Sequence, residues 1–84
     1  MITRIDPELA RLFDENPGVE VEAIVFSADG LDDLLAQLPP DVRVVYQYRL
    51  NPSVCVAATG SSLRRLADLP VVKSIEPVRS VSAF

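Results

Sequence analysis

The sequence contains no histidine and no tryptophan, and it has a single cysteine among its 84 residues. Histidine is the commonest general base and the commonest metal ligand, so its absence makes an enzyme or a metal site the weaker expectation. One cysteine cannot form an internal disulfide, so the domain must fold without the covalent staples of small secreted scaffolds. We therefore expect no catalytic residue, no bound metal and no cofactor.

Long apolar runs and positive charge are also scarce. The longest uncharged stretch, residues 50–63, is interrupted by Pro52 and Gly60 and is too short to cross a bilayer. Residues 1–7 lack the apolar segment of a signal peptide, so we expect a cytoplasmic protein; an extracellular location stays open for a chain clipped from a longer one. Eight Lys and Arg against twelve Asp and Glu give a net charge of −4. An acidic chain lacks the electrostatic footprint of a nucleic-acid binder, so we expect neither a membrane nor a nucleic-acid partner.

The remaining composition is that of one small globular domain, with 49% hydrophobic residues. Asp6-Pro7-Glu8 predicts a helix start. Beyond it, periodicity predicts a strand at 19–27, a helix at 31–38, strands at 41–50 and 53–59, a helix at 61–69 and a strand at 71–76. This order is the split βαβ arrangement (βαββαβ) of ferredoxin-like α+β folds, a four-stranded antiparallel sheet with two helices on one face. We divide the chain into an N-terminal helical extension (1–18), the ferredoxin-like domain (19–77) and an extended C-terminal tail (78–84).

Two local patterns make sharper predictions. Asp29-Gly30 predicts a turn in which Asp29 caps the following helix. In the strand at 41–50, Val44, Tyr46 and Tyr48 alternate with polar residues, so we expect the tyrosines in the core. The sheet face opposite the two helices would stay open unless the N-terminal helix folds over it.

Groups that could carry chemistry are few. The acidic pairs Asp32/Asp33 and Glu20/Glu22 are expected to be solvated charges, at a helix start and on the wet side of a strand. Without a histidine to activate it, Cys55 is expected to be a small, half-buried apolar residue.

Residues 60–65 offer two weaker features. Ser61-Ser62 opens a helix whose backbone donors could bind a phosphate, but Gly60 alone is not a phosphate loop. Arg64-Arg65 could contribute to a basic patch, yet the tyrosine pattern does not indicate a stacking platform for RNA. We expect neither feature to define the function.

The last four residues, Val81-Ser82-Ala83-Phe84, have the pattern of a peptide that fills alternate pockets of an extended cleft. Val81 and Phe84 would be the anchors, and the small residues between them would let the backbone pair with the cleft. A frayed chain end is the competing interpretation.

Residues 21–84 resemble the propeptides of subtilisin-like serine proteases and the free-standing inhibitors related to them. The resemblance lies in the strand at 21–26, the hairpin at 44–59 and the helix at 63–70, and most specifically in residues 71–77, VVKSIEP. The helix at 6–15 lies outside the part that the resemblance covers.

The resemblance implies a binding mode. The open sheet face would lie on the protease, and the tail would enter the active-site cleft like a cleaved product. By position, Phe84 would fill the first specificity pocket, Ala83 and Ser82 the second and third, and Val81 the fourth. Glu76 would accept hydrogen bonds from the free N–H groups at a helix start of the protease.

We therefore expect a monomeric inhibitor of a subtilisin-like serine protease that is not an enzyme, with assistance to protease folding as a second activity. The alternative is a ferredoxin-like module for protein interaction or small-ligand binding that binds no protease, since a fold alone does not determine function.

Overall fold

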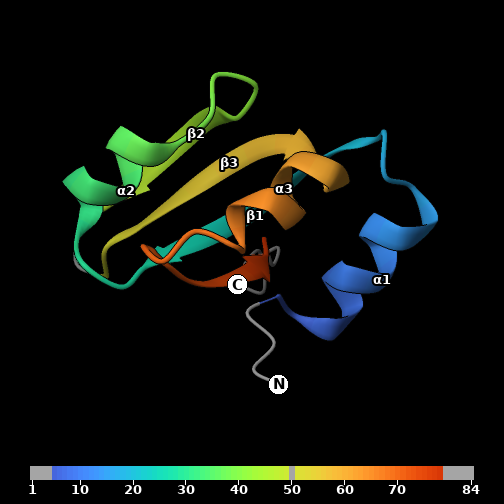
Figure 1. The fold of residues 1–84 in the computed structure, drawn as a ribbon, viewed down its shortest axis with the longest axis horizontal. Helices are drawn as coiled ribbons and strands as arrows, with labels where there is room; N and C mark the ends of the chain where they lie inside the picture. Colours follow the sequence, from blue (N-terminus) through green and yellow to red (C-terminus); the bar gives the residue numbers. More distant parts are fainter. Residues whose placement is uncertain (1–4, 50, 79–84) are drawn as a thin grey trace, which may run out of the picture.

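The structure is a computed structural model that describes residues 5–49 and 51–78. It contains a four-stranded antiparallel sheet and three helices, so the expected α+β class is confirmed (Figure 1). None of the helices in the described ranges is long and apolar enough to cross a membrane. The elements are α1 (Pro7–Glu15), β1 (Glu20–Ser27), α2 (Leu31–Gln37), β2 (Arg43–Tyr48), β3 (Ser53–Thr59), α3 (Gly60–Leu66) and β4 (Val72–Pro77).

The strands lie in the order β2-β3-β1-β4, and each pairs antiparallel with its neighbours. The central strand β3 is therefore flanked by β1 on one side and by β2 on the other. Residues Ser53 to Ala58 of β3 are all buried, whereas β2 at the edge is exposed throughout.

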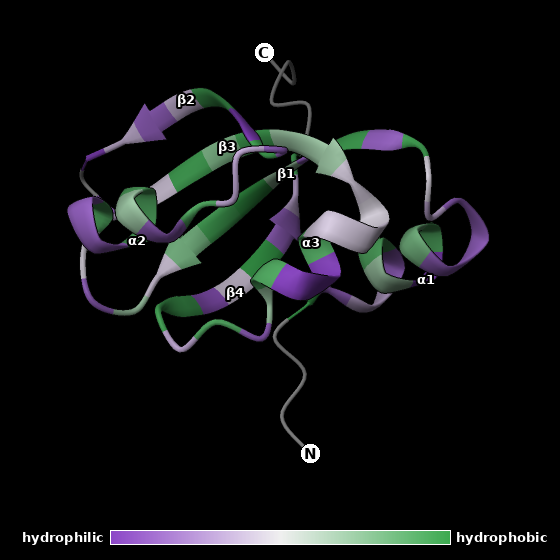
Figure 2. Cartoon of the chain, turned by 45° about the horizontal axis from the view of Figure 1, so that its top comes forward, coloured by the Kyte–Doolittle hydropathy of each residue, from purple (hydrophilic) through white to green (hydrophobic). Residues whose placement is uncertain are grey.

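The three helices pack on one face of the sheet or beside it (Figure 1). Strand positions alternate, and those on this face join apolar helix residues in a single core. The strand positions of the core include Ala23, Val25, Val54, Val56, Ala58 and Ile75, and its helix positions include Leu9, Phe13, Leu34, Leu63 and Leu66. Figure 2 shows β3 and much of β1 in the green of hydrophobic residues, whereas β2, β4 and the helices carry both hydrophobic and hydrophilic segments.

Helix α1 belongs to this core, although the sequence pattern set residues 1–18 apart as an extension. Phe13 is only 1% exposed and lies against Gly60, the first residue of α3. A Cβ atom at Gly60 would lie 3.0 Å from the Cα of Phe13, so the absence of a side chain there lets the two helices approach closely. Helix α1 consequently does not cover the opposite face of the sheet.

The chain before α1 covers part of one sheet edge. Ile5 forms an isolated parallel bridge with Ile75, and the backbone N–H of Asp6 donates to the carbonyl of Ile75 at 3.0 Å. These contacts satisfy part of the outer edge of β4, which would otherwise present unpaired backbone groups.

The cap at Asp6 forms as expected, Thr59 caps α3, and the cap expected at Asp29 does not form. The Asp6 carboxylate accepts from the backbone N–H of Glu8 at 3.1 Å, and the Thr59 hydroxyl accepts from that of Ser62 at 3.3 Å. The expected cap at Asp29 is wrong, because the residue before α2 is Gly30, which has a φ of +134° and no capping side chain. The Ser27 hydroxyl stabilises this turn instead, accepting from the Gly30 N–H at 2.9 Å.

Strand β2 contains an irregularity that overturns the expected position of its tyrosines. Val44 pairs with Val56 on the core face, but the register shifts before Tyr46, which pairs with Cys55 on the other face. The extra residue, Val45, forms a β-bulge, and a one-residue shift moves every following side chain to the opposite face. The tyrosines therefore lie outside the core, and Tyr46 is 59% exposed.

Candidate functional site

The sheet face opposite the helices is the candidate site, and we call it the open face. None of the described helices packs on it (Figure 1). Two rows of paired residues cross it from the edge strand β2 to the edge strand β4. The first row is Tyr46, Cys55, Ile24 and Glu76, and the second is Tyr48, Ser53, Phe26 and Ser74.

The middle of the open face is lined by small side chains. Ser53, Cys55 and Ala57 of β3 are each at most 5% exposed, although none of them belongs to the core cluster under the helices. They are flanked by the larger side chains of β1 and β2 in the same rows. The sequence alone left the face of Cys55 and Ala57 open, and the register places both on this one. Small side chains between larger ones allow a partner to approach the sheet closely.

Two exposed tyrosines lie along the β2 side of the open face. The Tyr46 and Tyr48 rings lie edge to face with their centroids 4.8 Å apart, and Tyr48 is 38% exposed. Exposed tyrosines carry a large apolar surface with a polar tip, which is why they are frequent in protein interfaces. The sequence pattern missed them as surface residues, because strict alternation placed them with Val44 in the core.

Glu76 lies exposed at the other side of the open face, opposite Ile24. It also lines a shallow surface hollow of about 380 Å³, together with Phe26 and Ser74 of this face and residues Ser27, Asn51, Pro52 and Lys73. The other four residues predicted for protease binding, Val81, Ser82, Ala83 and Phe84, lie outside the described residues. Of the predicted site, the structure therefore places only Glu76, and it places it on the open face.

Cys55 is chemically unsuited to act as a nucleophile. Burial, and then the charge of Glu22, raise the pKa of the thiol above its usual value, so the reactive thiolate is disfavoured at neutral pH. The strand register explains the effect of Glu22, which pairs with Ala57, two residues from Cys55 on the same face.

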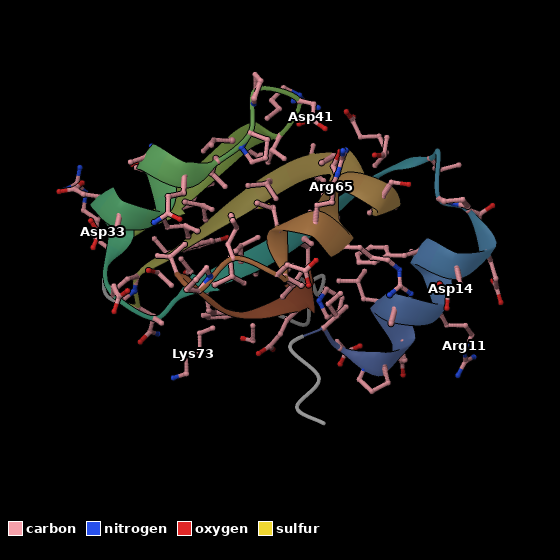
Figure 3. The ribbon with its side chains drawn as sticks, in the orientation of Figure 1. Arg11, Asp14, Asp33, Asp41, Arg65 and Lys73 are labelled. Carbon is pink, nitrogen blue, oxygen red and sulfur yellow. The ribbon has the colours of Figure 1, made fainter. Side chains whose placement is uncertain are left out.

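The start of α3 does not offer free donors for a phosphate. The Ser61 N–H and hydroxyl both donate to the carbonyl of Pro17, at 3.2 and 3.3 Å. The Ser62 hydroxyl donates to Asp41, and this bond is the main reason that the pKa of the Asp41 carboxyl is lowered. Arg65 lies 3.7 Å from the same carboxylate (Figure 3), so the cluster is a polar link between α3 and the loop before β2.

Arg43, Arg64 and Arg65 do not gather into a basic patch. Arg43, Arg64 and Arg65 form ion pairs with carboxylates on three different parts of the molecule, Glu20, Asp14 and Asp41 respectively. Within residues 5–49 and 51–78, no three potential metal ligands of the His, Cys, Asp and Glu types lie together. The open face is thus the most distinctive surface of the described chain.

Comparison with known proteins adds no relative. No protein-family model, no curated protein and no solved structure matches the chain significantly. The resemblance of residues 21–84 to subtilisin propeptides therefore rests on the residue pattern alone, and the function has to be argued from the geometry.

Proposed function

We propose that the protein is an inhibitor of a subtilisin-like serine protease, with no catalytic residue of its own. The open face would dock on the protease, and residues 81–84 would occupy the active-site cleft as a product-like peptide. The observation that carries this proposal is the open face itself, where small buried side chains lie between the exposed tyrosines of β2 and the half-buried Ile24 and Phe26 of β1. Such a surface is typical of an interface that is covered in a complex.

The position at which β4 ends supports the same binding mode. Glu76 lies on the open face near the end of β4, so β4 ends beside the proposed docking surface. A tail that starts there can enter a cleft while the sheet face holds the partner. In a chain that ends at Phe84, the terminal carboxylate would lie toward the oxyanion hole, and extended backbone pairing would add affinity.

We also propose that the fold is ferredoxin-like. The order strand–helix–strand–strand–helix–strand after α1 and the strand order β2-β3-β1-β4 both support this assignment, as does the packing of α2 and α3 on one face. In this arrangement α1 is an addition that extends the core, which would let the inhibitor fold before it meets the protease and reduce the cost of ordering on binding.

The proposal is tested by titrating a purified subtilisin with the 84-residue protein and following hydrolysis of a chromogenic peptide. We expect Phe84→Asp to weaken inhibition by about 100-fold or more, roughly 3 kcal/mol, because it removes an apolar contact and buries a charge. Ser80→Asp is the matched control, since it adds the same charge outside the four anchoring residues, and we expect it to change inhibition less than fivefold, about 1 kcal/mol.

A second variant separates docking of the sheet from binding of the tail. Tyr46→Arg introduces a long charged side chain at an exposed position, so the fold should persist while docking is hindered. Weaker inhibition with an unchanged circular dichroism spectrum supports docking through the open face. Inhibition that survives deletion of residues 81–84 undiminished contradicts the proposed mode. A stable dimer that affects no subtilisin would favour the alternative, a module that associates through the open face.

A further inference from the structure

The two sides of the open face differ in charge. Tyr46 and Tyr48 lie on one side of it, and Glu22 and Glu76 lie on the other. Since Ile24 is opposite Glu76, Glu22 is one diagonal step away from Glu76 on the same face, about 7–8 Å between Cα atoms. Both carboxylates are exposed. We call Glu22 and Glu76 the acidic corner.

No described cation neutralises the acidic corner. Glu20, on the same strand and face, is paired with Arg43 at 3.2 Å, but no Lys or Arg within residues 5–49 and 51–78 forms an ion pair with Glu22 or Glu76. Lys73 lines the hollow beside Glu76, yet its side chain extends away from the sheet (Figure 3).

Both carboxylates of the acidic corner border the apolar side chain of Ile24, since Glu22 lies two residues before it on β1 and Glu76 pairs with it on β4. Two exposed carboxylates without an ion-pair partner among the described residues give this part of the open face a negative potential. A partner surface of opposite charge is complementary to it.

We propose that Glu22 determines partner choice together with Glu76, and that the protease surface facing this corner carries cationic side chains. The same surface would present apolar side chains to Tyr46 and Tyr48. This inference rests on the proposed function, because it takes the open face to be the docking surface. It adds that binding is steered by charge and depends on the salt concentration.

The experiment measures inhibition of a subtilisin by the wild-type chain, Glu22→Gln and Glu15→Gln at low and high salt. Glu15→Gln is the matched control, because it removes the same charge from an exposed position at the end of α1, away from the open face. At low salt we expect Glu22→Gln to weaken inhibition about 3- to 10-fold, mainly through slower association, and Glu22→Lys to weaken it further. At high salt the effect of Glu22→Gln should shrink, while Glu15→Gln should change inhibition less than twofold under both conditions.

The outcomes are distinguishable. If the wild-type chain inhibits and Phe84→Asp does not, but Glu22→Gln behaves as wild type at both salt concentrations, the charge inference is wrong and the proposed function stands. Equal losses from Glu22→Gln and Glu15→Gln would also overturn the inference, because they would indicate a general effect of net charge. If the wild-type chain inhibits no subtilisin, the proposed function fails and this inference fails with it.

Discussion

Truncation of Phe13 to alanine tests whether α1 is part of the folding unit that holds the open face in place. Phe13 is one of the largest fully buried side chains, and it packs on Gly60 beneath the helix that follows β3. The Arg64 guanidinium lies 6.0 Å from its ring centroid, at the limit of a cation–π contact, so almost all of its contribution is apolar packing.

Phe13→Ala should lower the free energy of unfolding by a large amount for a protein of this size. Removing a buried phenylalanine costs about 3–5 kcal/mol, because the lost transfer free energy is combined with the cost of a cavity. A domain of 84 residues has a free energy of unfolding of roughly 4–13 kcal/mol. Phe13→Ala should therefore remove a quarter or more of the stability and lower the melting temperature by at least about 12 °C.

Urea denaturation followed by circular dichroism measures this change, with Leu12→Ala as the control in the same helix. Leu12 is 39% exposed, so its truncation should cost about 1 kcal/mol or less. Inhibition by Phe13→Ala should fall only in proportion to the fraction that is folded. If Phe13→Ala and Leu12→Ala lose stability equally, or if Phe13→Ala unfolds α1 without weakening the sheet, α1 is an appendage and the reasoning is refuted.

Two further predictions concern titration. The folded state raises the pKa of the Cys55 thiol, so the loss of its Raman S–H band with rising pH should have its midpoint above 9.0. Glu22→Gln should move that midpoint down. The contribution of this thiol to stability is present below the unfolded pKa and is lost as the pH rises through the folded value. A midpoint at or below 9.0 would contradict the assigned burial. The folded pKa of Asp41 is lowered, so its contribution to stability is present above pH 3.8 and is lost as the pH falls through the folded value. Urea denaturation between pH 2 and about 6 should show this acid loss in the wild type and a smaller one in Asp41→Asn, and identical acid limbs would exclude Asp41 as its source.

Local signals in the sequence determined much of the architecture. The strands and helices were predicted in their correct order, because apolar periodicity and end signals such as Asp6-Pro7 act within a few residues. Leu34, Leu63 and Leu66, which recur with helical periodicity, are buried in the core. Helix α3 ends at Leu66, earlier than the predicted residue 69.

Only the tertiary structure decided what the open face presents. A β-bulge at Val45 leaves no clear mark in the sequence, since a β-branched residue fits a regular strand equally well, yet the shift turns Tyr46 and Tyr48 outward. The closeness of Glu22 and Glu76 likewise depends on the register between β1 and β4, which joins segments far apart in the chain. Short-range preferences specify which residues form a strand, whereas packing of the whole core determines which strands are its neighbours and in which register. The acidic corner and the exposed tyrosine pair arise only from that packing.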